Sequence, residues 1–269
     1  MIPNLQEQVV TRAITSERLV IGIDDFAIRK GHTYNTGIHD LRNGLLLYIA
    51  QGRKCDELMH NKGLKDIVTK LQPIAVVMDL AKSYHNFAKE VFPNAIRIAD
   101  RFHVNRYIAE ALHTICKRLT KSIPSRQAKQ LKRSKKLLGK RHDSLTSREQ
   151  ELLLEILKIS DELSQVYSLK ESLIDWYDYS NKSNALPLLN KWIQRGKTLA
   201  ISEITEALKT FENWSVEISN YHYCRFTNAA VEGRNNKIKA LQRRCYFLRN
   251  RKSYEYRIYL ECNNRAMAV

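Results

Sequence analysis

Four acidic residues in this chain stand where carboxylates could do chemistry. Three short apolar runs each end on an aspartate, and a glutamate follows much later in a basic segment. The runs are Leu19–Asp24, Ile74–Asp79 and Ala95–Asp100, and the basic segment, which holds Glu232, is Asn228–Lys239. Continuous apolar runs of this length are typical of buried strands. Because acids at the carboxyl ends of neighbouring strands meet at one edge of a sheet, we expect these side chains to converge.

Converging carboxylates repel one another, and a divalent cation relieves that repulsion. Oxygen ligands of this hard type select Mg²⁺ or Mn²⁺ over zinc. Two such ions activate a water or a 3′-hydroxyl and stabilise the leaving oxygen of an in-line displacement. For a basic chain the matching substrate is a phosphodiester, so the pattern indicates metal-dependent cutting and joining of DNA.

Taken singly, each acid also has an ordinary structural explanation. Asp24 is followed by Asp25, and adjacent residues on a strand face opposite sides, so only one of the two joins the cluster. Any of the strand-end aspartates could cap the loop or helix that follows. Glu232 could pair with the amide of Asn236 or lie beside Lys239 on a helix. Three strand-end acids together with the late glutamate make an accidental set less plausible.

The charge of the chain favours a polyanionic partner. It has 269 residues and a formal net charge of +17. Residues 101–150 carry 14 Lys/Arg against 3 Asp/Glu, and residues 225–257 carry 10 against 2. Clustered cations gain affinity for nucleic acid by releasing phosphate counterions. The alternative is a pair of solvated helix faces.

Hydrophobic periodicity and turn signals predict the order of the elements. Asn43-Gly44 is a hairpin signal, which makes the strands on either side of it antiparallel. Helices between the later strands favour parallel crossovers. The predicted strands are 18–28, 33–39, 45–50, 74–79 and 95–100, the predicted helices are 55–71, 83–91 and 102–119, residues 120–220 are all helical, and 227–268 form one long helix or a broken pair.

This order predicts an α/β protein with a ribonuclease-H-like mixed sheet. We expect residues 18–119 and 221–269 to form one catalytic domain and residues 120–220 to form a large all-helical insertion. Residues 1–17 are polar and are expected to be a lead-in or linker. The five cysteines show no C-x-x-C spacing, which argues against a zinc ribbon or a disulfide framework. No window is apolar enough for a membrane span or a secretion signal, so we expect a cytoplasmic protein.

Four motifs in this order resemble the catalytic domain of bacterial insertion-sequence transposases, and the most similar group is the ISL-three family. The motifs are Gly22–Tyr34, Met78–Tyr84, Asp100–Val104 and Val231–Lys239. The resemblance covers residues 18 to 262 and implies a DDE-type transposase with a ribonuclease-H-like fold and an Asp-Asp-Glu triad. The triad falls on Asp24, Asp79 and Glu232, which would hold Mg²⁺ or Mn²⁺, as two ions.

The resemblance also places Asp100 and His103 beside the site without making them triad members. On charge and position we expect Arg101, Lys239, Arg243 and Arg244 to contact DNA phosphates. The implied partners are double-stranded DNA, as transposon ends and target, and a second copy of the chain in a synaptic complex at the nucleoid. Family members typically also carry an N-terminal zinc module and a helix-turn-helix; neither is visible here, so the chain resembles the catalytic part alone. The family's Tyr-Gly-Tyr-Arg-Asn stretch appears as Cys245–Asn250, without the glycine.

Three other functions remain open at this point. The chain could be a catalytically inactive DNA-binding remnant of a transposase, which metal-dependent nicking would distinguish. It could be a ribonuclease-H-like nuclease or resolvase, which would prefer RNA hybrids or branched DNA. A helical interaction scaffold built on residues 120–220 would show no affinity for nucleic acid at low salt.

Overall fold

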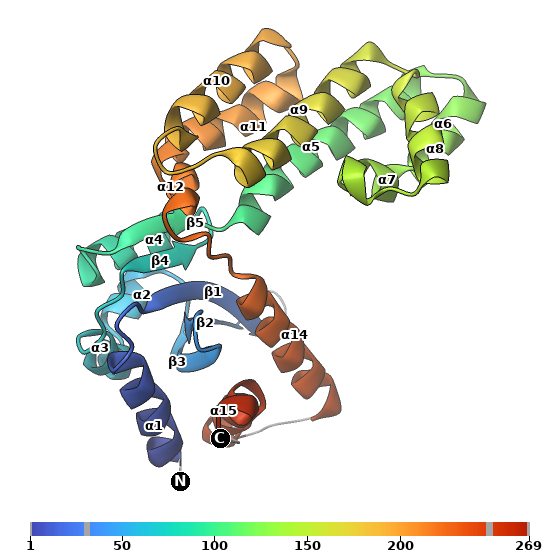
Figure 1. The fold of residues 1–269 in the computed structure, drawn as a ribbon. Coiled ribbons are helices and arrows are strands. Elements are labelled where there is room, and N and C mark those ends of the chain that lie inside the picture. Colours follow the sequence, from blue (N-terminus) through green and yellow to red (C-terminus); the bar gives the residue numbers. More distant parts are fainter. Residues whose placement is uncertain (1, 30–32, 246–249, 268–269) are drawn as a thin grey trace. The chain divides into compact units, whose positions relative to one another are not determined.

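The computed structural model describes residues 2–29, 33–245 and 250–267, and the chain forms two compact units (Figure 1). One unit, the sheet unit, comprises Met1–Phe102 and Cys224–Val269, and the other, the helical unit, comprises His103–Tyr223. The helical unit therefore begins with the helix that we had assigned to the catalytic domain up to residue 119. Each unit is described by itself below.

A mixed five-stranded sheet organises the sheet unit. Its strands are β1 (Val20–Arg29), β2 (Thr33–Asp40), β3 (Leu45–Gln51), β4 (Ala75–Met78) and β5 (Ile96–Ala99). The order across the sheet is β3-β2-β1-β4-β5. β1, β2 and β3 pair antiparallel, whereas β4 pairs parallel to both β1 and β5. This is the predicted ribonuclease-H-like arrangement.

Local sequence explains the sheet. All four residues of β4 are buried, as expected for a central strand covered on both faces. Between β2 and β3 the Asp40 carboxylate accepts the backbone N–H groups of Arg42 (2.9 Å) and Asn43 (3.1 Å), and Gly44 takes a φ of +68°. An aspartate that binds its following backbone and a glycine in the left-handed region are the elements of a tight turn.

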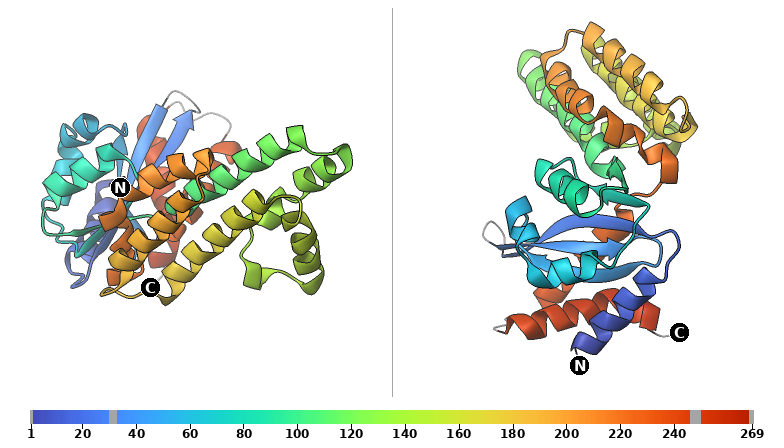
Figure 2. Two further views of the ribbon diagram at one scale, coloured as in Figure 1. Left: turned by 90° about the horizontal axis from the view of Figure 1, so that it is seen from above. Right: turned by 90° about the vertical axis from the view of Figure 1, so that its left-hand side faces the viewer.

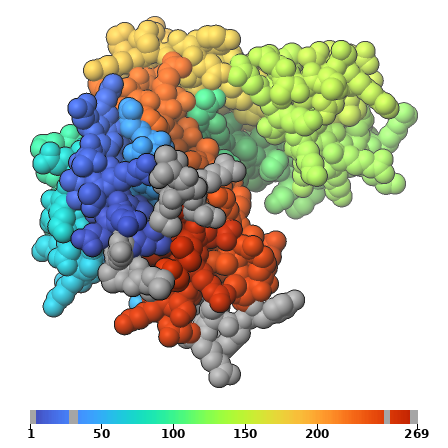
Figure 3. All heavy atoms as spheres, turned by 60° about the horizontal axis from the view of Figure 1, so that its bottom comes forward, coloured from blue at the N-terminus to red at the C-terminus, as the bar shows by residue number. Residues whose placement is uncertain are grey.

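Helices cover both faces of this sheet. Figure 2 shows α4 (Lys82–Val91) on one face and α1 (Ile2–Ile14) and α15 (Arg251–Met267) on the other. α1 and α15 contact each other and β3, and Figure 3 shows them side by side at the surface. α14 (Ala229–Arg244) contacts β1 and α15. The C-terminal region is thus the broken pair of helices, and residues 246–249 of the Cys245–Asn250 stretch lie outside the described residues.

Two local predictions were wrong. Residues 1–17, expected to be a lead-in or linker, contain α1, because Leu5, Val9 and Ala13 recur every fourth residue and are buried. The single helix predicted over 55–71 is two short helices, α2 (Cys55–Met59) and α3 (Lys62–Val68). Asn61 separates them, because its side chain accepts the Leu64 N–H at 2.9 Å and so starts a new helix.

Two side chains of α15 form hydrogen bonds with the backbone of the edge strand β3. The Asn263 amide oxygen accepts the Leu46 N–H at 2.8 Å, and its amide nitrogen donates to the Leu46 carbonyl at 3.1 Å. The Tyr259 hydroxyl oxygen accepts the Ile49 N–H at 3.1 Å. Because an uncovered edge is a template for aberrant pairing, these contacts fix α15 and protect the sheet together.

The described residues of the helical unit form helices and contain no strand, which agrees with the all-helical region predicted for 120–220. Trp176 donates to the Ala185 carbonyl at 2.9 Å and Trp192 donates to the Leu169 carbonyl at 3.0 Å, so both indoles are core residues with a satisfied N–H. The elements are α5 (Arg101–Ser122), α6 (Ser125–Arg133), α7 (Lys135–Gly139), η1 (His142–Ser144), α8 (Ser147–Leu157), α9 (Asp161–Tyr179), α10 (Ala185–Thr198), α11 (Ser202–Asn213), α12 (Ser215–Ser219) and α13 (Tyr221–Cys224).

Among the residues that the structure describes, none of the helices is both long and apolar enough to cross a bilayer.

Candidate active site

The register of the parallel strands brings three aspartates into line. The last register pair between β1 and β4 joins Ile23 to Met78, and the last pair between β4 and β5 joins Met78 to Ala99. The next residue on each strand is Asp24, Asp79 and Asp100, respectively. Although β1 itself continues to Arg29, its parallel pairing ends just before Asp24. The three acids therefore occupy equivalent positions along the edge of the sheet at which the parallel pairing of β1, β4 and β5 ends, as the sequence predicted.

Asp25 lies on this edge as well. Burial raises the pKa of Asp25, the Asp79 carboxylate raises it further, and the Arg53 guanidinium opposes both effects. The Arg53 Nη1 lies 3.6 Å from the Asp25 Oδ2. The electrostatic effect of Asp79 on Asp25 shows that carboxylates of β1 and of the β4 end are close enough to interact. Such crowding of like charges is the condition that a bound cation relieves.

Tyr84 on α4 packs beside the same acids. It is buried, and burial raises the pKa of its hydroxyl, with Asp25 and Asp24 adding to the rise. Its hydroxyl lies 3.4 Å from the Thr36 Oγ1 on β2. Tyr84 is the last residue of the motif that begins at Met78. This motif therefore supplies both the Asp79 carboxylate and a buried side chain that packs beside the acids.

Two buried asparagines fasten α14 to the edge of the sheet. The Asn235 amide nitrogen donates to the Asp24 Oδ2 at 2.8 Å, and the Asp24 Oδ1 accepts the Asp25 N–H at 2.8 Å. The Asn228 amide nitrogen donates to the Ile23 carbonyl at 3.2 Å. The carboxylate of Asp24 is therefore oriented from both its oxygens, one by its own strand and one by α14.

Gly22 permits this close approach of α14. A Cβ built on Gly22 would lie 2.6 Å from the Leu41 Cδ2 and 2.8 Å from the Asn228 Oδ1. Real Cβ atoms do not approach other atoms this closely, so a larger residue forces the neighbours apart. The glycine of the first motif is thus explained by packing against the helix that carries Glu232.

Asp100 supports the start of the same helix. Its Oδ1 accepts the backbone N–H of Asn228, the N-cap residue of α14, at 3.1 Å. Asp100 is also buried, with 2% of its surface exposed. A carboxylate at a helix N-terminus is favoured by the helix dipole. The Asp100 carboxylate thus holds the first turn of α14, and His103, three residues further along the chain, is the first residue of the helical unit.

Glu232 lies one helical turn from the residue that binds Asp24. Asn235 follows it by three positions on α14, and residues three apart are neighbours on a helix surface. Val231, Arg234 and Ile238 are buried, whereas Glu232 and Lys239 are exposed. Glu232 thus stands at the border between the buried stripe of α14 and its exposed stripe, which continues through Asn236, Lys239 and Arg243.

The donor atoms at this edge suit a hard divalent cation. Asp24, Asp79 and Glu232 offer carboxylate oxygens, and the buried amide oxygens of Asn228 and Asn235 have no hydrogen-bond partner in the part of the chain that the structure describes. Within residues 2–29, 33–245 and 250–267, no three His, Cys, Asp or Glu side chains are grouped closely enough to hold one ion. The donors therefore fit the implied ion by type, whereas the three acids are not drawn around a common point.

Comparison with known proteins places this site in a family. The model for DDE transposases of the ISL3 type, described as "Transposase", matches residues 21–258. The chain belongs to this transposase family. The match runs from β1 to α15, so it includes every acid discussed above and the whole helical unit. It does not favour the inactive remnant or the resolvase considered from the sequence.

Curated proteins that are similar to this chain are also described as transposases. The chain is 27% identical over 256 residues to "Transposase for insertion sequence element IS1001" of Bordetella parapertussis, which covers 88% of this chain and 59% of that protein. It is 25% identical over 253 residues to "Transposase for insertion sequence element IS1557" of Mycobacterium tuberculosis, covering 86% of this chain and 57% of that protein. The chain thus spans somewhat under two thirds of the length of these relatives.

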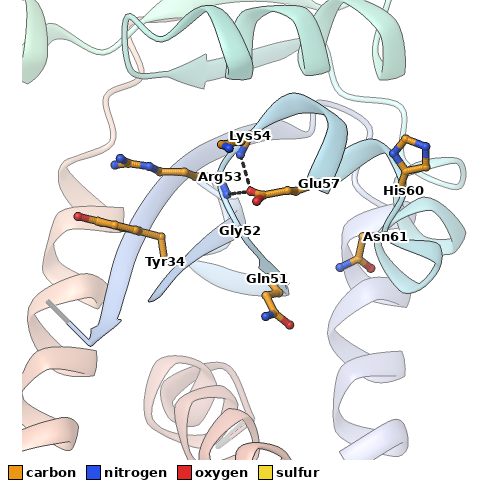
Figure 4. A pocket seen from close by; sticks show the side chains of 8 residues that line it. All are labelled: Tyr34, Gln51, Gly52, Arg53, Lys54, Glu57, His60 and Asn61. Carbon is orange, nitrogen blue, oxygen red and sulfur yellow. Dashed lines mark hydrogen bonds between the residues drawn. The ribbon is translucent and has the colours of Figure 1, made fainter. Parts of the chain in front are cut away.

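A pocket of about 470 Å³ adjoins the site through Arg53 (Figure 4). The Arg53 guanidinium lies over the Tyr34 ring, 4.0 Å from its centroid, in addition to its contact with Asp25. The Glu57 Oε2 accepts the backbone N–H groups of Arg53 and Lys54, both at 2.9 Å, and so ties the loop carrying these cations to α2. Arg53 therefore joins this aromatic and basic pocket to the acidic edge.

Sequence reasoning did not assign roles to the residues that position the acids. Asn228, Asn235, Gly22 and Tyr84 lie within the recognised motifs or directly before them, but their partners are far away along the chain. One local signal existed: Asn228 precedes a helical pattern and is a favoured N-cap residue.

Proposed function

We propose that this chain is the catalytic domain of a DNA transposase. It hydrolyses the phosphodiester at a transposon end and transfers the resulting 3′-hydroxyl into target DNA. The observation that carries the proposal is the edge where Asp24 and Asp79 stand in register and where Asn235, one turn from Glu232, donates to Asp24. Membership of the transposase family supports the same reaction class.

Asp24, Asp79 and Glu232 are the proposed catalytic triad and the proposed ligands of Mg²⁺ or Mn²⁺, as two ions. When bound, such ions lower the pKa of an attacking oxygen and stabilise the leaving oxygen of the phosphodiester. The protein's own contribution is orientation: Asn235 fixes the Asp24 carboxylate, and Asp100 with Asn228 fixes the first turn of α14. Closing the triad requires the exposed Glu232 side chain to turn toward Asp24, for which its position one turn from Asn235 is suitable.

The exposed stripe of α14 is the proposed DNA contact beside the acids. Lys239 and Arg243 are exposed there and would bind phosphates. Arg244 is also exposed, but its Nη2 lies 3.1 Å from the Glu261 Oε1 of α15, so it would exchange that partner for a phosphate. Arg101 follows Asp100 directly and is proposed to contact the same strand. The partners are double-stranded DNA and, in a synaptic complex, a second copy, in the bacterial cytoplasm at the nucleoid.

The proposal is tested by Asp79→Asn, which removes a ligand oxygen but keeps the side-chain shape. We expect nicking of supercoiled plasmid in Mg²⁺ to fall at least about 100-fold, about 2.7 kcal/mol, while affinity for duplex DNA changes less than about threefold. The control is Asp66→Asn, the same substitution at an exposed position on α3. If Asp79→Asn nicks at the wild-type rate and EDTA abolishes that nicking, metal-dependent cleavage does not need Asp79, and the triad is overturned.

A further inference from the structure

The helical unit carries a concentration of cations that the proposed active site does not use. Residues 117–142 contain 11 Lys/Arg and no Asp or Glu. At its centre α6 presents four exposed cations, Arg126, Lys129, Lys132 and Arg133, while Ala128 and Leu131 are buried beneath them. We call these four cations the α6 face. Figure 1 shows α6 with α7 and α8 at one end of the long helix α5.

None of the four cations of the α6 face has an ion-pair partner within the described residues. Several other cations of this unit are paired: Arg118 pairs with Glu162 and with Glu203 (2.8 Å), and Lys209 pairs with Glu206 at 2.6 Å. The acid that reaches α6 is Glu155 of α8, at 3.5 Å, and its contact is with Gln130 rather than with a cation.

This arrangement is unfavourable for the isolated helix. Like charges three and four residues apart repel on a helix surface, and Arg126 stands in the first turn, where the helix dipole disfavours a cation. The dipole favours Lys132 and Arg133 in the last turn, but the repulsion among the four exposed cations remains. An external polyanion supplies the missing counter-charge, and phosphate groups along a duplex are spaced closely enough to meet several of the four at once.

We propose that the α6 face is a second DNA interface, which holds duplex DNA outside the active site through phosphate contacts that are independent of base sequence. The inference rests on the proposed function, because it takes DNA as the substrate. It goes beyond that function by assigning the grip on flanking duplex to the helical insertion rather than to the catalytic edge. Its cations contribute affinity and salt dependence, not the chemistry of cleavage.

The test compares two variants with the same loss of charge. The first replaces the α6 face with Arg126→Gln, Lys129→Gln, Lys132→Gln and Arg133→Gln. The matched control replaces four exposed lysines elsewhere in the helical unit, Lys158, Lys191, Lys197 and Lys209, by Gln. Binding of the full chain to 40-base-pair duplexes of two unrelated sequences is followed by anisotropy in EDTA between about 50 and 200 mM salt, a range in which several phosphate contacts change the affinity strongly.

We expect the α6 variant to lose at least about tenfold in affinity at 100 mM salt on both duplexes, and its log–log salt slope to fall by about 2 to 4, near 0.9 per lost contact. The control should retain most of its slope. Equal losses in both variants indicate a general charge effect and overturn the interface, as does an unchanged α6 variant. Nicking by the wild-type chain, measured in parallel, distinguishes failure of this interface from failure of the proposed function.

Discussion

The hydrogen bond between Asn235 and Asp24 is the most informative contact to perturb. Asn235→Asp replaces a donor 2.8 Å from the Asp24 Oδ2 by a second carboxylate. Two unit charges about 4 Å apart cost about 4 kcal/mol at an effective dielectric constant near 20. Protonating the new carboxyl avoids this repulsion and lets it donate to Asp24, but at pH 7.5 that protonation itself costs about 5 kcal/mol from a pKa near 3.9.

The predicted loss of stability in the sheet unit is therefore about 4 kcal/mol at pH 7.5. At pH 5 protonation costs only about 1.5 kcal/mol, so most of the loss is recovered. The sign follows because the folded state raises the pKa of the new carboxyl. Stability is fully present below the unfolded pKa and is lost as the pH rises through the folded one. Asn236→Asp, the same change at the exposed neighbouring position, should stay within about 0.5 kcal/mol at both pH values.

Hydrogen exchange measured in EDTA reports this loss locally. Peptides from β1 and α14 should exchange at least about 100-fold faster in Asn235→Asp at pH 7.5, after correction for the intrinsic rate. All three tryptophans, Trp176, Trp192 and Trp214, belong to the helical unit, so their fluorescence gives an internal reference that should not change. Wild-type protection in β1 and α14 at pH 7.5 would refute the assigned contact.

Three further predictions concern the same unit. Gly22→Ala should lower the free energy of unfolding by about 1–3 kcal/mol, because its Cβ meets the Asn228 Oδ1; an unchanged denaturant midpoint would contradict this packing. Asn263→Leu leaves the Leu46 N–H and carbonyl without their partner and should cost about 2–5 kcal/mol in calorimetry, whereas a neutral result would remove α15 as the cover of β3. Asp25→Asn should be more stable than the wild type by a margin that grows as the pH rises from 4 to 7. Burial and Asp79 raise the pKa of Asp25, so its ionisation destabilises the wild type over this range; a wild-type pH dependence of the melting temperature in the variant would disprove this.

Local patterns were sufficient to predict the sheet and the line of acids. The apolar runs predicted β4 and β5, and Asn43-Gly44 predicted the β2–β3 turn, because backbone preference and burial act over a few residues. Parallel pairing then placed Asp79 and Asp100 at one edge without further information. The same local logic failed at Asn61, where a side-chain cap divides an otherwise continuous helical pattern.

The contacts that support the site could not be predicted from the sequence, because they join residues that are distant along the chain. Asn235 binds Asp24 across 211 positions, and Asn228 binds Asp100 across 128. An asparagine on a helix is equally consistent with an exposed polar face, so its partner is defined only once α14 is docked on β1. The burial of α1 was missed although Leu5, Val9 and Ala13 recur at helical spacing, because the elements that cover this stripe, β3 and α15, come later in the chain.

The central claim is that Asp24, Asp79 and Glu232 share divalent cations. Anomalous scattering from crystals soaked in Mn²⁺ tests it most directly, because it needs neither the transposon ends nor turnover. We predict a Mn²⁺ peak bounded by oxygens of all three side chains, with Glu232 turned toward Asp24 and Asn235 still bound to it. A peak held by Asp25 or Asp100 in place of these ligands, with Glu232 remote from the ion, would contradict the triad.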